Sequence, residues 1–383
     1  MNTDSVKRAF VKHFKHAPII VKSPGRINII GEHTDYNSGY MLPAAIDKAI
    51  YVAVSRRSDH EIHLFSESYA EMVKSSIFAL TKSDKNWANY ILGVADQLQK
   101  WDYKIGGFNL YITGDVPLGA GLSPSAAGAC ATTYALVELF SLSVPKLDIA
   151  RIAQKAEQTF AGVNFGVMDQ FASVFGKKGN AILLDCKSLK CQYIPLKLEG
   201  YKLVLLNTNV KHSLANSAYN RRRQQCEQGV AWIKANVSKV NTLRDVNVKM
   251  LDKYVKTKDV DVYQKCRFVV EENERVLAAI THIENGNLRG LGQAMFETHD
   301  GLSRAFRVSC EELDFLVELV KNLPYVLGAR MMGGGFGSCT LNLVEAGKVN
   351  EFIENLQKAY AAEFLIKLDA YCVEIGDGTT LVL

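Results

Sequence analysis

S-P-G-R-I-N-I-I-G-E-H-T-D-Y-N-S-G-Y-M-L-P, residues 23–43, gathers opposed charges, a histidine and three glycines in one short stretch. Arg26 supplies a cation, Glu32 and Asp35 supply two anions, and His33 supplies an imidazole that can switch its charge. Such a set can hydrogen-bond a polyhydroxylated ligand while balancing charge beside it. A charged loop that pairs with itself is the alternative, because loops collect polar residues and glycines.

The overall composition is that of a folded globular protein. The chain has 383 residues, which favours two domains, with 48% hydrophobic and 22% charged residues. Its net charge of +5 comes from 45 basic and 40 acidic residues spread along the chain, so we expect no nucleic-acid partner. The first 15 residues lack the apolar core of a secretory signal, and no run approaches the roughly 18 apolar residues of a membrane helix. We therefore expect a cytoplasmic protein with no membrane partner and with reduced cysteines.

Hydrophobic patterning predicts an α+β protein with helices on one face of a sheet. Residues 50–55 and 61–66 favour two paired strands, and the loop 56–60 would link them. The other expected elements are strands at 108–113, 181–184, 192–196, 202–206, 326–331, 339–343 and 370–375, helices at 88–100, 125–140, 146–160 and 349–364, and a helix-rich stretch at 213–323. The composition shift places a domain boundary near Asp185, which gives domains 1–185 and 186–383.

V-P-L-G-A-G-L-S-P-S-A-A, residues 116–127, is a glycine-serine loop that runs directly into a helix of small residues. Backbone amides at a helix start carry partial positive charge, and glycines let a phosphate approach closely. The loop therefore indicates an anion site, although it matches neither a Walker loop nor a dinucleotide-binding fingerprint. An ordinary helix start is the alternative, with Ser123 as N-cap and Pro124 as first helical residue.

F-A-G-V-N-F-G-V-M-D-Q-F-A-S-V-F, residues 160–175, places Asp169 in neutral and largely apolar surroundings. A carboxylate there costs desolvation energy unless it meets a partner, and Arg26 is the candidate that would hold it ionised. A helix N-cap is a second, compatible role for Asp169. Glu157 lies on the preceding predicted helix, where it could bind a metal ion or simply be solvated.

With these motifs in order, the chain resembles the galactokinase family of the GHMP small-molecule kinase superfamily along nearly its full length. G-R-I-N-I-I-G-E-H-T-D-Y-N-S-G resembles the galactokinase signature, P-L-G-A-G-L-S-P-S-A-A the ATP loop of the superfamily, and residues 332–340, M-G-G-G-F-G-S-C-T, its third motif. Residues 207–223 and 308–314 also resemble galactokinase segments. The resemblance implies a two-domain GHMP kinase fold, with an N-terminal mixed-sheet α/β domain, a C-terminal ferredoxin-like domain and an active site in the cleft between them.

The resemblance also implies a reaction, in which the γ-phosphoryl group of ATP passes to the anomeric hydroxyl of galactose with Mg²⁺ present. Asp169 would be the catalytic carboxylate, as a base or as an electrostatic orienter, and Arg26 would stabilise it and the transferred group. The sugar would contact Glu32, His33, Asp35, Gly166 and Tyr219. The nucleotide would contact Gly119, Ala120, Gly121, Leu122, Ser123, Ser125, Trp87 and Tyr90, and the metal Ser125 and Glu157.

Plain core packing is the alternative for Trp87 and Tyr90, and a simple strand connection is the alternative for Gly333–Ser338. We expect Arg221–Arg223 to form a solvated face. Pro124 departs from the three serines usual in the family, which removes one amide donor from the loop. Ala218 stands where many relatives carry glutamate, which we interpret as a neutral surface change.

Two other functions stay open at this point. N-acetylgalactosamine or another sugar could replace galactose, because the width of the pocket beside C2 cannot be measured from a sequence. A sensor that binds galactose and ATP without turnover is the third hypothesis. The full-length glycine-serine loop of this chain and the presence of Arg26 and Asp169 argue against it. By analogy with the family we expect a monomer.

Overall fold

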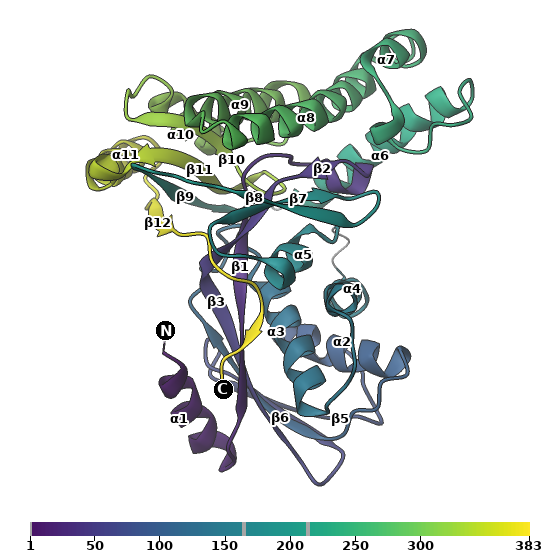
Figure 1. Cartoon of the computed structure of the whole chain (residues 1–383), viewed down its shortest axis with the longest axis vertical. Coiled ribbons are helices and arrows are strands. Elements are labelled where there is room, and N and C mark those ends of the chain that lie inside the picture. Colours follow the sequence, from purple (N-terminus) through teal and green to yellow (C-terminus); the bar gives the residue numbers. More distant parts are fainter. Residues whose placement is uncertain (1, 163–165, 212–214) are drawn as a thin grey trace.

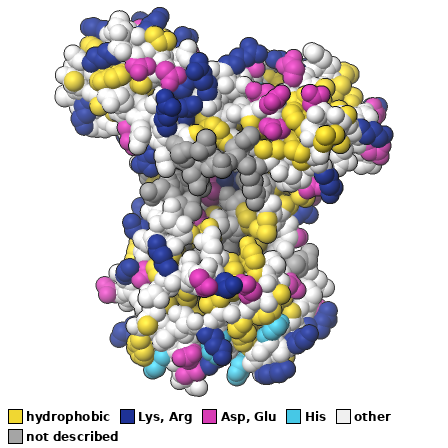
Figure 2. All heavy atoms as spheres, turned by 180° about the vertical axis from the view of Figure 1, so that it is seen from behind, with side chains coloured by type: hydrophobic (Ala, Val, Ile, Leu, Met, Phe, Trp, Pro, Cys, Tyr) yellow, Lys and Arg dark blue, Asp and Glu magenta, His cyan; other side chains and the backbone are white. Residues whose placement is uncertain are grey.

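A computed structural model describes residues 2–162, 166–211 and 215–383 of the chain. Residues 163–165 of the Asp169 segment and 212–214 of the segment 207–223 therefore lie outside the described residues. The molecule has two lobes joined by a narrower waist, with both termini in the lower lobe (Figure 1). The opposite side shows the same waist as a hollowed region of the surface (Figure 2).

A six-stranded mixed sheet forms the lower lobe, with strand order β13-β1-β3-β6-β4-β5. Its strands are β1 (Ile19–Asn28), β3 (Pro43–Arg56), β4 (Glu61–Ser66), β5 (Glu71–Ser76), β6 (Phe108–Gly114) and β13 (Thr380–Leu381). Its helices are α1 (Thr3–Phe14), α2 (Asn86–Lys100), α3 (Pro124–Leu139), α4 (Lys146–Ala156) and α5 (Met168–Phe175). Apolar residues of α2, α3 and α4 join those of the sheet in one core, while α1 packs on the sheet in a separate cluster around Phe10 and Tyr111.

The predicted pairing of the strands at 50–55 and 61–66 is wrong. Both segments are strands, but β6 lies between β3 and β4 in the sheet and pairs with each of them. The β4–β6 pair is parallel, whereas a tight hairpin joins only antiparallel strands. The segment 57–60 therefore connects two strands that are not neighbours.

The upper lobe contains a four-stranded antiparallel sheet with strand order β10-β11-β9-β12. Its strands are β9 (Tyr201–Lys211), β10 (Val326–Met331), β11 (Gly337–Glu345) and β12 (Asp369–Val373). Its helices are α6 (Ala215–Lys234), α7 (Val248–Tyr254), α8 (Val260–Glu284), α9 (Leu288–Asp300), α10 (Glu311–Val320) and α11 (Val349–Phe364), and the long α8 and α9 lie side by side at the top of the molecule (Figure 1). This strand order with intervening helices is the expected ferredoxin-like arrangement.

A third sheet, β2-β7-β8, lies near the junction of the lobes and consists of β2 (Tyr40–Met41), β7 (Asn180–Asp185) and β8 (Lys190–Pro195). β7 and β8 pair with each other, so a hairpin spans the predicted boundary at residue 185. The last strand, β13, returns to the lower lobe and pairs with β1 through Val21 and Leu381. The division into domains 1–185 and 186–383 stays a prediction. The β7–β8 hairpin crosses the predicted boundary, and β13 returns from the second predicted domain to the sheet of the lower lobe.

Short helical turns complete the chain: η1 (Asp35–Asn37), η3 (Leu243–Asp245) and η5 (Ala346–Lys348) are 3₁₀ turns, and η2 (Glu157–Ala161) and η4 (Gly301–Phe306) are π-helical. The predicted helix at 146–160 is confirmed as α4 continued by η2. π-Helical turns frequently mark functional sites. Within the described ranges, we find no helix with both the length and the apolar character needed to cross a membrane.

Candidate active site

The phosphate loop enters α3 as the sequence predicts, but with a different use of Ser123. Pro124 is the first residue of α3, and Ser123 occupies the N-cap position with a left-handed backbone, φ +52°. Its hydroxyl does not cap the helix. It donates to Asp169 Oδ2 at 2.5 Å, so the start of the helix is held against the acid of α5.

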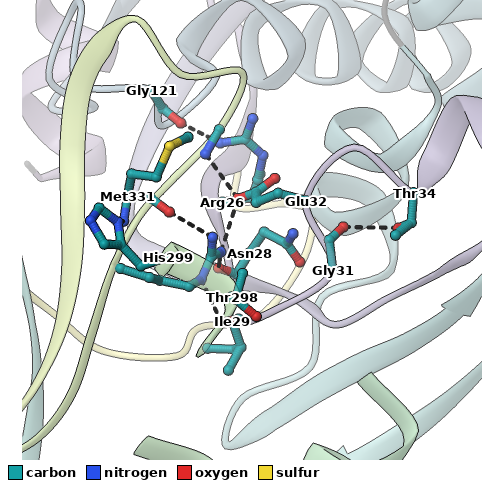
Figure 3. A network of polar contacts seen from close by, with 12 residues as sticks. Arg26, Asn28, Ile29, Gly31, Glu32, Thr34, Gly121, Thr298, His299 and Met331 are labelled. Atoms are coloured by element: carbon teal, nitrogen blue, oxygen red, sulfur yellow. Dashed lines mark hydrogen bonds and ion pairs between the residues drawn. The ribbon is translucent and has the colours of Figure 1, made fainter. Parts of the chain in front are cut away.

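Arg26 and Asp169, which are 143 residues apart in sequence, form a nearly buried ion pair with 2.8 Å between Nε and Oδ1. A second guanidinium nitrogen of Arg26 donates to the carbonyl oxygen of Gly121 in the phosphate loop (Figure 3). Arg26 therefore connects β1, the loop and α5. The expected contact between Arg26 and Asp169 is confirmed, while the catalytic roles of both residues stay predictions.

A cavity of about 490 Å³ opens at this ion pair, and most of the predicted site residues line it. Its lining includes Arg26, Glu32, His33, Asp35, Gly119, Gly121, Ser123, Ser125, Glu157, Gly166, Asp169 and Tyr219. Ala120 and Leu122 are fully buried and line neither this cavity nor the next one. Their predicted contacts with a nucleotide through backbone amides stay predictions.

One ring nitrogen of His33 has a hydrogen-bond partner, and the other has none among the described residues. Nδ1 lies 2.9 Å from the hydroxyl of Tyr36, and Nε2 is buried without a hydrogen-bond partner among the described residues. Burial lowers the pKa of His33 to about 4. The imidazole is therefore neutral near pH 7, and the sequence-based view of it as a charge switch is wrong, because desolvation outweighs the nearby Glu32 carboxylate.

Burial raises the pKa of the Asp35 carboxyl to about 6, and the negative charges of Asp169 and Glu32 add to this effect. Asp35 begins η1 and faces the backbone of Gly166. A side chain at position 166 would collide with the Asp35 carboxylate, so glycine is required for this close approach. Tyr219 closes the same region, with its ring 5.4 Å from that of His33.

Glu32 is anchored by the upper lobe. Its Oε1 accepts from the fully buried Arg330 at 2.9 Å and from the amide of Gly333 at 2.8 Å. Arg330 also donates to the carbonyl oxygens of Asn28 and Ile29 at the end of β1. Residue 330 carries no motif signal in the sequence, and only the three-dimensional structure shows that β10 fixes the geometry of the lower-lobe loop.

The Arg221–Arg223 run is less solvated than expected. Arg222 is half-buried and donates to the carbonyl oxygens of Phe306 and Arg307, at 2.6 and 2.9 Å. Phe306 in turn packs its ring 4.8 Å from the His33 ring. The prediction of a solvated face is therefore wrong for Arg222, because the end of η4 offers carbonyl groups that need a donor.

A second cavity of about 600 Å³ adjoins the first, and Pro124 and Ser125 line both. Trp87 and Tyr90 line the second cavity from α2, as expected for a nucleotide base site. Tyr69 also lines it, with its ring nearly parallel to that of Trp87 at 6.4 Å between centroids. The sequence gives no signal for Tyr69, since it lies in the short connection between β4 and β5.

Ser125 and Glu157 meet where the two cavities join. The Ser125 hydroxyl interacts with the Glu157 carboxyl group, and Gln170 donates to Glu157 Oε2 at 3.0 Å. Within the described part of the chain, Oε1 of Glu157 is buried without a hydrogen-bond partner, and burial raises the pKa of this carboxyl to about 8. Among the residues that the structure describes, no group of three or more His, Cys, Asp or Glu side chains could hold a metal ion. One hydroxyl and one unpartnered carboxylate oxygen nevertheless fit Mg²⁺, which binds few protein oxygens beside phosphate oxygens and water.

Comparison with known proteins places this site in a family. The chain matches the galactokinase galactose-binding signature over residues 8–56, the GHMP kinase N-terminal domain over 89–177 and the GHMP kinase C-terminal domain over 277–362.

Two galactokinases are among its relatives in sequence. The chain is 42% identical to one from Thermotoga neapolitana, across 94% of this chain and 98% of that protein, and 39% identical to one from Chloroflexus aurantiacus, across 98% and 96%.

Solved structures agree. The crystal structure of Lactococcus lactis galactokinase complexed with galactose matches with a TM-score of 0.94 and 33% identity, covering 98% of this chain and 99% of that one. Methanococcus jannaschii mevalonate kinase, at 17% identity and a TM-score of 0.67 over 95% and 100% of the two chains, shares the fold. The chain therefore belongs to the galactokinase family of the GHMP kinases.

Proposed function

We propose that this chain transfers the γ-phosphoryl group of ATP to the anomeric hydroxyl of galactose, giving galactose 1-phosphate and ADP. The observation that carries the proposal is the Arg26–Asp169 ion pair, which lies inside the cavity and is tied to the phosphate loop by Ser123 and Gly121. Family membership makes the chain an ATP-dependent sugar kinase.

In this proposal the sugar lies beside Glu32, His33, Asp35, Gly166 and Tyr219. Neutral His33 presents Nε2, and Glu32 and Asp35 present carboxylate oxygens to sugar hydroxyls. Arg330 holds Glu32 in place and leaves Oε2 of Glu32 for the ligand. The arrangement supports recognition of hydroxyl positions, because His33 and Glu32 are each fixed by a separate partner before the ligand arrives.

Asp169 accepts or orients the proton of the anomeric hydroxyl while that oxygen attacks the γ-phosphorus and the bond to the ADP oxygen breaks. Arg26 and Ser123 hold the carboxylate of Asp169 in one orientation. Arg26 also adds positive charge next to the transferred group. Ser125 and Glu157 would hold Mg²⁺, which supplies charge neutralisation on the phosphates when bound.

A coupled assay of ADP release tests the proposal with galactose, N-acetylgalactosamine, arabinose and glucose as acceptors. We expect turnover with galactose above the other sugars. Preference for N-acetylgalactosamine would change the substrate, and no turnover with any sugar, together with binding of galactose and ATP, would identify a sensor. Monomeric state and cytoplasmic location stay predictions.

The catalytic assignment has its own test. Asp169→Asn should lower kcat by at least about a hundredfold, the usual size of a base or orienting contribution, while the melting profile stays cooperative. A rate close to that of the wild-type chain would move the catalytic role to another residue.

A further inference from the structure

Ser338 lies at an irregular point of the upper-lobe sheet. β11 pairs with β9 through Gly337 and Lys211 on one side and through Cys339 and Asn207 on the other, and the register shifts between them. Three residues of β9, 208–210, therefore lie opposite Ser338 alone, which makes a β-bulge in β9 at this point, and such bulges are common beside active sites.

The backbone of Ser338 is strained for a residue with a side chain. Its φ is +78°, in the left-handed region that favours glycine, and its two predecessors, Phe336 and Gly337, also have positive φ. The hydroxyl of Thr208 donates to the carbonyl oxygen of Ser338 at 2.9 Å and fixes the bulge. Glycine would relieve the strain at position 338, so the retained hydroxymethyl group calls for a use.

Among the residues that the structure describes, the hydroxyl of Ser338 has no adequate hydrogen-bond partner. Apart from an interaction with the neighbouring thiol of Cys339, a weak hydrogen-bonding group, buried Oγ finds no hydrogen-bond partner among the described residues. Ser338 also lines the active-site cavity. A buried hydroxyl at the edge of a ligand cavity, without a partner, is a donor available to a ligand.

The position of Ser338 determines which part of a bound ligand its side chain would face. The glycine turn that precedes it begins on the sugar side, where Gly333 donates to Glu32 and Gly334 contacts Tyr219. The turn ends on the phosphate side, where Oγ of Ser338 lies so close to Gly121 that a side chain at Gly121 would collide with it.

Gly121 is the loop residue whose carbonyl accepts from Arg26 (Figure 3), and Arg26 also donates to Asp169. This part of the loop therefore faces the reacting end of the nucleotide. We propose that the Ser338 hydroxyl donates a hydrogen bond to the terminal phosphoryl group of ATP, as the contribution of the upper lobe to phosphoryl binding. The inference rests on the proposed placement of the ATP phosphates on the loop at 119–125.

Two substitutions separate the hydroxyl from the backbone strain. Ser338→Ala removes the hydroxyl and keeps the strain, whereas Ser338→Gly removes both. We expect both variants to lose about 10- to 100-fold in kcat/KM for ATP, the range for a hydrogen bond to a charged group. Ser338→Gly should at the same time melt about 2–4 °C higher than the wild-type chain. A residue with only a structural role would move activity and stability in the same direction.

Ser141→Gly is the matched control, because Ser141 is an exposed serine with φ +55° that lies outside both cavities. The melting temperature of Ser141→Gly should rise by a similar amount, and its kinetics should stay those of the wild-type chain. Equilibrium binding then identifies the contacted group: both Ser338 variants should bind a non-hydrolysable ATP analogue more weakly and bind ADP and galactose as the wild-type chain does.

The proposal on Ser338 is overturned if Ser338→Ala keeps wild-type kcat/KM for ATP, if ADP binding weakens as much as binding of the ATP analogue, or if only the KM for the sugar changes. Turnover of galactose by the wild-type chain in the same experiment shows independently whether the proposed function holds.

Discussion

Asp35→Asn should make the ligand-free chain more stable at neutral pH while removing a contact to the sugar. The Asp35 carboxyl is buried beside the negative charges of Glu32 and Asp169, and its pKa is raised to about 6 from an ordinary value of 3.8. Asparagine keeps the shape of the side chain and carries no charge. The substitution therefore removes an unfavourable charge at a place where the proposed function requires an acceptor.

The magnitude follows from the two pKa values of Asp35. A pKa difference of one corresponds to about 1.4 kcal/mol, so a rise from 3.8 to about 6 would amount to about 3 kcal/mol for a fully buried group. The Asp35 side chain keeps some exposure through the cavity, and solvent there screens part of the effect. We therefore expect a gain of about 1–2 kcal/mol in the free energy of unfolding.

The upward direction of the Asp35 pKa shift sets the pH range in which the stability difference appears. Between about pH 4 and 6 the folded chain still holds a proton on Asp35 that the unfolded chain has released, so wild-type stability falls through this window relative to the variant. The advantage of Asp35→Asn should be near zero at pH 4 and complete above pH 6. Urea unfolding of both chains at pH 4.5, 5.5, 7 and 8 without ligands measures it.

The same variant should have a raised KM for galactose, by about tenfold or more if a charged acceptor is lost. A stability difference that does not change with pH, or a variant that is less stable than the wild-type chain at pH 8, would refute this account of the Asp35 charge. An unchanged KM for galactose would refute its proposed contact with the sugar.

Three further substitutions test other parts of the cleft. Pro124→Ser restores an amide donor at the loop and should lower the KM for ATP or raise turnover; unchanged kinetics would count against a phosphate role for this position. Glu157→Gln should raise the Mg²⁺ concentration for half-maximal rate by at least about tenfold, and a wild-type Mg²⁺ titration would contradict the proposed metal site. Arg330→Met leaves Glu32 buried without its cation and should cost about 3–5 kcal/mol in urea unfolding, whereas Arg330→Lys should recover part of this; equal stability of Arg330→Met and the wild-type chain would refute the anchor.

Local signals explain why much of the fold follows from the sequence. The helices α2, α3 and α11 and the strands β6, β7 and β10 lie where the hydrophobic pattern predicts them, because each shows its burial in its own residues: α2 and α11 by one apolar face, and α3 and β10 by a continuous run of apolar and small residues. Strand pairing does not follow in this way. β4 chooses β6 over its sequence neighbour β3, and β13 joins β1 across more than 350 residues, so these contacts depend on packing that no short window contains.

The site residues also fall into those that the sequence predicts and those that only the structure shows. Arg26 and Asp169 are predictable partners, since an isolated carboxylate in an apolar segment needs a cation. Arg330, Tyr69 and Ser338 are not predictable from residue type. Arg330 is recognised by its burial and its four acceptors, Tyr69 by the parallel ring of Trp87, and Ser338 by a backbone angle and an unpartnered hydroxyl.

The carboxylates of the cleft differ in how they are neutralised, and this difference bears on ligand binding. Asp169 and Glu32 each have an arginine within 2.9 Å, whereas Asp35 and Glu157 show no ion pair among the described residues, and burial raises the pKa of both. The Asp169 charge contributes to both elevations. The two carboxylates without a cation are also the two that the proposed function assigns to ligands, a sugar hydroxyl at Asp35 and a divalent cation at Glu157. A divalent cation at Glu157 would stabilise the charged carboxylate that burial disfavours, and a sugar hydroxyl would give Asp35 a hydrogen-bond donor, so part of the binding free energy of both ligands is set by the fold before they bind.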